Sequence, residues 1–207
     1  MHIEGTNQWT NTQPDQYLTA IHEGAHCVIA NLLAGYPGAS GIKIFPSNPD
    51  DATNWRGYCE ILEFRDGWSH EPDVAMAWAD MLVGFAGPAS SLKLEWGVSP
   101  LLNCQEMTPT NVREHWTGYG GDEVHCAALA CAYWPREHFE TVMDAAAQVA
   151  SDLVCDETIW RCIVAVGDYV VARRSASATE IELLVHRFIQ DPFPAPRLGW
   201  ALGLAQK

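Results

Sequence analysis

The segment AIHEGAHCVIA, residues 20–30, places two histidines and a glutamate in an otherwise apolar run. His22 and His26 are four residues apart, a spacing that puts both imidazoles on one face of a helix. Two imidazoles placed in this way can bind one zinc ion, while Glu23 can reach a water molecule that the metal activates and take its proton. This H-E-x-x-H pattern predicts metal-assisted attack of water on a carbonyl group, with Glu23 as the general base. A solvent-facing helix that matches the pattern by chance is the alternative.

A catalytic zinc ion needs a third protein ligand and an open coordination position. The extended pattern H-E-x-x-H-x-x-G-x-x-H is absent, because Ile29 and Leu32 stand where it has its glycine and its third histidine. We expect the third ligand to be Asp122 in GYGGDEVHCAALA, where a glycine-rich turn leads an acid into an apolar helix. A simple helix cap is the alternative for this aspartate. His125 and Glu60 are the alternative ligands.

The remaining pattern predicts a mainly α fold with a small β-sheet (α+β). Capping signals at residues 12–15 and a stop at Gly35 and Pro37 predict that the histidine-bearing helix covers residues 14–34. Short apolar runs at 41–45 and 58–64, separated by a loop rich in Pro, Asn and Asp, predict an antiparallel pair of strands. Further helices are expected over residues 73–94, 122–133, 136–154, 158–173 and 179–188. The first of these is expected to be broken or kinked near Gly87–Pro88, and the last begins with a capping box of Thr179 and Glu182. Residues 99–117 are expected to be irregular.

Composition limits the classes of partner. The chain has 207 residues, a net charge of −14 and only 12 lysines and arginines, without a basic run, so nucleic acid and anionic membrane surfaces are not expected partners. No apolar run is long enough to span a bilayer, and the polar start does not resemble a signal peptide. The seven cysteines contain no C-x-x-C pair and are typical of reduced thiols. We expect a cytoplasmic protein with a flexible N-terminus (1–11), a single zinc peptidase-like domain (12–190) and a Pro/Gly-interrupted tail (191–207).

The stretch YLTAIHEGAHCVIANLLAG resembles the zinc-binding helix of the FtsH-type peptidases, the proteolytic domains of membrane-anchored AAA+ proteases. GIKIFP lies where that family has its first strand after the motif. MLVGFAGPASSLKLEWG resembles the family's G-G-R-A-A-E-E-L-x-F-G helix, and GYGGDEVHCAALA resembles its G-A-x-x-D-L-x-x-A-T segment. The likeness covers roughly residues 16–186 and implies a zincin-like helical peptidase domain. In it, His22, His26 and Asp122 bind Zn²⁺ and Glu23 is the catalytic base.

The sequence departs from this family in three places. The order Gly24–Ala25 is the reverse of the usual Ala-Gly, a change that we expect to be tolerated. Pro88, Ser90 and Ser91 replace the arginine and the glutamates of the family's second helix, so the contacts of that helix are expected to differ. The chain also has no G-x-x-x-x-G-K-[ST] phosphate loop, so a peptidase of this kind would need a separate unfoldase or adaptor to act on folded proteins.

The resemblance implies a zinc metallopeptidase that cuts flexible or unfolded polypeptides. It also suggests that the strand at 41–45 is an exposed edge that aligns a peptide by β-strand addition, and that the protein could form homo-oligomers. Trp55 or Trp68 could line the substrate groove. The alternative functions are a zinc-stabilised binding or adaptor module of the same fold without turnover, and a metal-free helical interaction protein.

Overall fold

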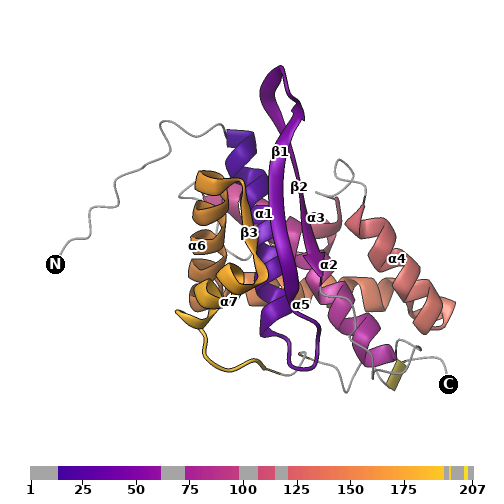
Figure 1. Ribbon diagram of the computed structural model, residues 1–207. Coiled ribbons are helices and arrows are strands. Elements are labelled where there is room, and N and C mark those ends of the chain that lie inside the picture. The colour runs from indigo at the N-terminus through magenta and orange to yellow at the C-terminus, as the bar shows by residue number, and fades with distance from the viewer. Residues whose placement is uncertain are drawn as a thin grey trace.

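Helices carry most of the chain, and a three-stranded sheet covers part of the helical core (Figure 1). The computed structural model describes residues 14–61, 73–97, 107–114, 121–193, 196 and 203–204. The α+β class is as the sequence predicts. The helices are α1 (Pro14–Leu32), α2 (Val74–Gly97), α3 (Pro109–Glu114), α4 (Asp122–Tyr133), α5 (Phe139–Cys155), α6 (Glu157–Arg173) and α7 (Ala178–His186), with a 3₁₀ turn η4 (Arg136–His138) before α5. The strands are β1 (Ala39–Asn48), β2 (Asp51–Ile61) and β3 (Ser175–Ser177).

Helix α1 lies at the centre of the fold. It packs against α2 and α6 and against the β1–β2 hairpin, which crosses in front of it in Figure 1. Ile21, Ala25 and Val28 are completely buried. A Cβ atom on Gly167 would lie 2.5 Å from Ile21 Cδ1, so this glycine allows α6 to approach α1 closely. Because α1 is enclosed by other elements, the polar side chains that it carries into the interior need partners there.

The sheet has the order β2-β1-β3, and both pairs of strands are antiparallel. Ile42 and Ile44 of β1 are buried, whereas Phe45 lies on the opposite, more exposed face. The hairpin is longer than predicted, since most of residues 46–57 are strand rather than loop. Pro46 is tolerated because Ile44, two residues earlier, donates its N–H to Arg174 on the β3 side. The nitrogen of Pro46 faces that same side beyond the end of β3, so no ladder hydrogen bond is lost.

The short strand β3 was not predicted, and it corrects the expected role of β1. Residues 41–43 of β1 pair with β3 on one side and with β2 on the other, so this stretch is central in the sheet and is not an exposed edge. The outer strand beside α1 is β2.

Helix α2 continues through Pro88, so the break that the sequence predicts as the alternative to a kink is absent. A proline inside a helix costs roughly 3 kcal/mol because it removes one backbone hydrogen bond and crowds the preceding turn. Residues on both sides of the proline, including Phe85 and Leu92, are buried against the core. Each such side chain contributes about 1.5–3 kcal/mol, which is enough to keep the helix continuous.

Two smaller predictions, one about an irregular stretch and one about a helix cap, are also corrected. Helix α3 lies in the stretch expected to be irregular, and its first residue, Pro109, is suited to a helix start because it lacks an N–H. The capping box of α7 is formed by Ser177 and Glu180 rather than by Thr179 and Glu182. Glu180 Oε2 accepts the backbone N–H of Ser177 at 2.8 Å.

The described part of the C-terminal tail packs on the body of the protein. Phe193 accepts the backbone N–H of Ala34 and donates its own to Leu32, both at 2.8 Å. The indole N–H of Trp78 donates to the carbonyl of Pro196 at 2.8 Å. The remaining tail residues and residues 1–11 lie outside the described part of the chain. None of the helices in that part is long and apolar enough to cross a bilayer.

Candidate metal centre

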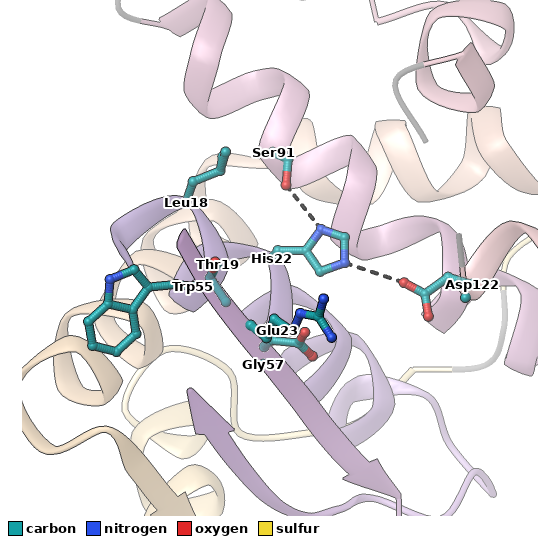
Figure 2. Close-up of a pocket in the computed structure, with 10 residues that line it drawn as sticks. Leu18, Thr19, His22, Glu23, Trp55, Gly57, Ser91 and Asp122 are labelled. Atoms are coloured by element: carbon teal, nitrogen blue, oxygen red, sulfur yellow. Dashed lines mark hydrogen bonds and ion pairs between the residues drawn. The ribbon is translucent and has the colours of Figure 1, made fainter. Parts of the chain in front are cut away.

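His22 and His26 project from α1 toward the first residue of α4, Asp122 (Figure 2 shows the first of these contacts). Both histidines are buried, with 8% and 6% of their surface exposed. The Nε2 atom of His22 lies 3.3 Å from Asp122 Oδ2, and that of His26 lies 3.2 Å from the same oxygen. The structure thus brings together the three residues that the sequence predicts as metal ligands.

The two distances to Asp122 Oδ2 match the spacing of ligand atoms around a tetrahedral metal ion. Zn–N and Zn–O bonds of about 2.0–2.1 Å place two tetrahedral ligand atoms about 3.3 Å apart, because the edge of a tetrahedron is about 1.63 times the centre-to-corner length. All three ligand atoms lie within 4.8 Å of one another. Among the described residues, they are the only group of three His, Cys, Asp or Glu side chains close enough to share an ion.

The second nitrogen of each imidazole is held by helix α2. His26 Nδ1 donates to the carbonyl of Val83 at 2.7 Å, and because a carbonyl only accepts, Nδ1 must carry the hydrogen. In the neutral ring the lone pair is then on Nε2, the atom that faces Asp122. His22 Nδ1 lies 3.0 Å from Ser91 Oγ, and a histidine that binds metal through Nε2 donates this N–H to the hydroxyl oxygen. Both rings are therefore oriented for coordination through Nε2.

Gly87 of α2 provides the space in which the two imidazoles meet. A Cβ atom at this position would lie 2.6 Å from His26 Cε1 and 2.7 Å from His22 Nε2, much closer than van der Waals contact. No residue with a side chain fits there without moving the rings. The backbone of α2 thus forms one wall of the candidate centre.

The charges at the site are strongly coupled. Burial alone would raise the pKa of Asp122, but the hydrogen bonds from His22 and His26 outweigh it and hold this pKa well below its usual range. Burial alone would lower the pKa of His26, but the hydrogen bond and negative charge of Asp122 raise it to about 10. Without metal, His26 and Asp122 therefore form an imidazolium–carboxylate pair. A bound cation would take the place of this proton.

Glu23 lies beside the candidate metal centre between α1 and β2 (Figure 2). It is half-buried, and a Cβ atom on Gly57 of β2 would lie 2.5 Å from its Cγ, so the glycine makes room for the carboxylate. Glu23, Gly57 and Asp122 line two cavities of about 460 and 240 Å³. The larger is also lined by Leu18, Thr19, His22, Trp55, Arg56, Ser91 and Gly121. The carboxylate thus has access to both cavities, of which the larger is lined by His22 and the smaller by His26.

The outer edge of β2 faces the same region. Ile44 directs its N–H to Arg174, so its partner across the hairpin, Gly57, is in a non-hydrogen-bonded pair. The N–H and C=O of Gly57 therefore point away from β1. The N–H of Trp55, two residues earlier, points the same way and donates to the carboxylate of Asp15. The edge available beside Glu23 is β2, not the predicted β1.

The other predicted residues have different placements. His125 does not join the ligand group; its Nε2 lies 3.2 Å from Asp80 Oδ2 in the smaller cavity. Glu60 is an exposed residue of β2 that lines neither cavity, so its proposed role as a ligand is wrong. Trp55 does line the larger cavity, whereas Trp68 lies outside the described residues.

Sequence reasoning missed the contributions of Gly87, Ser91 and Gly57 to this site. Gly87 and Ser91 are four residues apart on α2, so the spacing that places the two histidines on one face also places these two residues together. That spacing was a usable signal, but it does not show that this face of α2 turns toward α1.

Comparison with known proteins adds no assignment: no protein-family model matches the chain, and a search of curated proteins finds no match. The function is therefore inferred from the residues of the site.

Proposed function

We propose that this protein is a zinc metallopeptidase of the FtsH type, which hydrolyses peptide bonds in flexible or unfolded polypeptides. The observation that carries this proposal is the convergence of His22, His26 and Asp122 beside a cleft that Glu23 also lines. Two imidazoles and one carboxylate are a common donor set of catalytic zinc sites, which keep a further position open. Their oriented Nδ1 atoms and the space at Gly87 also support metal binding.

A zinc ion held by these three residues would supply Lewis acidity, which activates water and polarises the carbonyl of the substrate. Glu23 is the proton acceptor for the attacking water, because it is the carboxylate beside the donors that is not itself among them. Glu23 then returns the proton to the nitrogen of the leaving amine. His22, His26 and Asp122 would hold the ion, and Ser91 and the carbonyl of Val83 keep the imidazoles oriented.

The edge of β2 supports an extended polypeptide as the substrate. The outward N–H and C=O of Gly57 lie beside Glu23, where they can pair with the backbone of a strand-like peptide. Pairing of this kind needs an extended segment whose backbone groups are free. Flexible loops and unfolded chains offer such segments, whereas the interior of a folded domain does not.

The test is proteolysis of casein by the zinc-loaded wild type and by Glu23→Gln. The variant keeps the shape of the side chain but removes the proton acceptor, so we expect it to retain zinc and to lose two or more orders of magnitude in rate. Glu60→Gln, an exposed glutamate of β2 that lines neither cavity, is the matched control and should cleave at the wild-type rate.

Cleavage by Glu23→Gln as fast as by wild type would refute the proposed mechanism. Stoichiometric zinc in the wild type without cleavage of casein or of a broad peptide set would instead favour the zinc-stabilised binding or adaptor module.

A further inference from the structure

The smaller cavity continues from the candidate centre toward α2 and α4. Besides residues that it shares with the larger cavity, its lining includes Tyr36, Tyr58, Asp80 and His125. Its volume of about 240 Å³ is below the roughly 300–1,000 Å³ of most small-molecule sites, so it suits one side chain rather than a length of chain. The reaction proposed above makes no use of the residues at its far end.

Asp80 is held in place at that end by two contacts. The hydroxyl of Tyr36 donates to Asp80 Oδ1, and His125 Nε2 lies 3.2 Å from Asp80 Oδ2. Each carboxylate oxygen can accept more than one hydrogen bond, so both retain acceptor capacity. About a third of the side chain, 32%, is exposed. The carboxylate is thus fixed in orientation and still accessible from the cavity.

The lining of the cavity favours a cation. It contains the three carboxylates of Glu23, Asp80 and Asp122 and no lysine or arginine. Asp122 is committed to the metal ligands and Glu23 to proton transfer, so Asp80, which His125 contacts on one oxygen, is the remaining carboxylate that a ligand can reach. Tyr36 and Tyr58 add aromatic surface, against which the aliphatic part of a long basic side chain can pack.

A second metal ion is less consistent with these residues. His125 and Asp80 form a pair, and no third donor joins them among the residues that the structure describes. The Tyr36 hydroxyl, which donates to Asp80, is also a poor metal ligand while it keeps its proton. Its pKa is raised far above the usual value, first by burial and then by the charge of Asp80.

We propose that this cavity is a specificity pocket that accepts a lysine or arginine side chain of the substrate beside the cleaved bond, with Asp80 as its anionic contact. The inference rests on the proposed peptidase function and names the substrate preference of that same site. Asp80 is a specificity-determining residue here and takes no part in bond cleavage. Tyr36 and His125 act through Asp80 by fixing the direction of its carboxylate.

The test compares peptides that differ only in charge. Zinc-loaded wild type is given two series of fluorogenic peptides. Arginine or its neutral isostere citrulline stands directly before the cleaved bond in one series and directly after it in the other. We expect kcat/KM at one of these positions to be about tenfold or more higher for arginine. Asp80→Asn should abolish this difference between the arginine and citrulline peptides. The matched control Asp152→Asn, an exposed acid of α5 that lines neither cavity, should preserve it.

Equal kcat/KM values for arginine and citrulline at every position in the wild type would overturn the pocket assignment, and this comparison does not depend on any variant folding. A persistent preference in folded, zinc-loaded Asp80→Asn would also overturn it. If the wild type cleaves none of the peptides, the peptidase proposal fails, and the pocket is tested by calorimetric binding of the same peptides to zinc-loaded Glu23→Gln. Tighter binding of the arginine peptide supports the pocket, and equal binding contradicts it.

Discussion

Gly87→Ala provides a strict test of the candidate metal centre because it adds one methyl group where the two imidazoles meet. The new Cβ atom would lie 2.7 Å from His22 Nε2, about 0.8 Å closer than a normal contact of about 3.5 Å, and 2.6 Å from His26 Cε1. Zinc–ligand distances tolerate deviations of only about 0.2 Å. At least one imidazole must therefore leave its coordinating position.

The expected effect on zinc affinity is large. Structural zinc sites with four protein ligands bind with about 10–16 kcal/mol, or about 3 kcal/mol per ligand, so the loss of one imidazole raises the Kd more than a hundredfold. The metal-free protein should remain folded, because alanine is favoured over glycine in a helix by about 1 kcal/mol, which partly offsets an overpacking cost of about 1–3 kcal/mol. The assay is competition with a chromophoric zinc chelator, accompanied by thermal melting.

Gly84→Ala is the matched control. It lies almost one turn earlier on α2, and its Cβ atom would lie 2.6 Å from Cys126 Sγ instead of an imidazole. It introduces a comparable steric clash into the same helix but should retain wild-type zinc affinity. If Gly87→Ala binds zinc as tightly as Gly84→Ala, the metal-binding nitrogens do not face α2 as described, and the site geometry is wrong.

Three further perturbations test the support of the site. Ser91→Ala removes the hydroxyl beside His22 and should weaken zinc binding about 10–100-fold in the same competition assay. The control Ser90→Ala removes a hydroxyl bonded to backbone carbonyls and should keep the wild-type zinc affinity. Equal affinities of the two variants would exclude an orienting role for Ser91. Gly57→Ala should push Glu23 aside and reduce kcat by about a hundredfold or more with zinc retained, and loss of zinc instead would show that the clash reaches the ligands. Because the pKa of His26 in the metal-free protein is raised to about 10, zinc must displace a proton below that pH, so the apparent Kd should fall about tenfold for each unit that the pH rises between pH 6 and pH 8. Calorimetry in buffers of different ionisation enthalpy should detect the released proton. A zinc affinity that does not change with pH would contradict this coupling.

The local part of the site was predictable from the sequence. The positions of His22 and His26 on one face follow from helical spacing, and the start of α1 follows from its capping signals. The contact with Asp122 joins residues a hundred positions apart, and no local rule gives such a pairing. It was predicted because a catalytic zinc ion needs a third ligand and because the segment resembles a known ligand segment.

The remaining features depend on tertiary packing. Gly87 and Ser91 serve the site only because α2 is rotated so that this face meets α1, and helical periodicity does not set the rotation of a helix that is apolar on most sides. The strand β3, with three residues, is too short to show an alternating pattern, yet its pairing makes β1 central and leaves the edge of β2 beside the site. The Asp80–His125 contact likewise joins α2 to α4, and sequence spacing gave no signal for it.

The proposed metal centre consists of one zinc ion bound by three residues from two helices. Elemental analysis of protein purified in the presence of zinc measures this for the wild type, Asp122→Ala and Glu123→Ala, the neighbouring acid of α4 that is not in the donor group. We expect one zinc ion per chain in the wild type and in Glu123→Ala, and less than about a tenth of that in Asp122→Ala. A wild type without zinc, or Asp122→Ala with as much zinc as the wild type, would contradict the proposed centre.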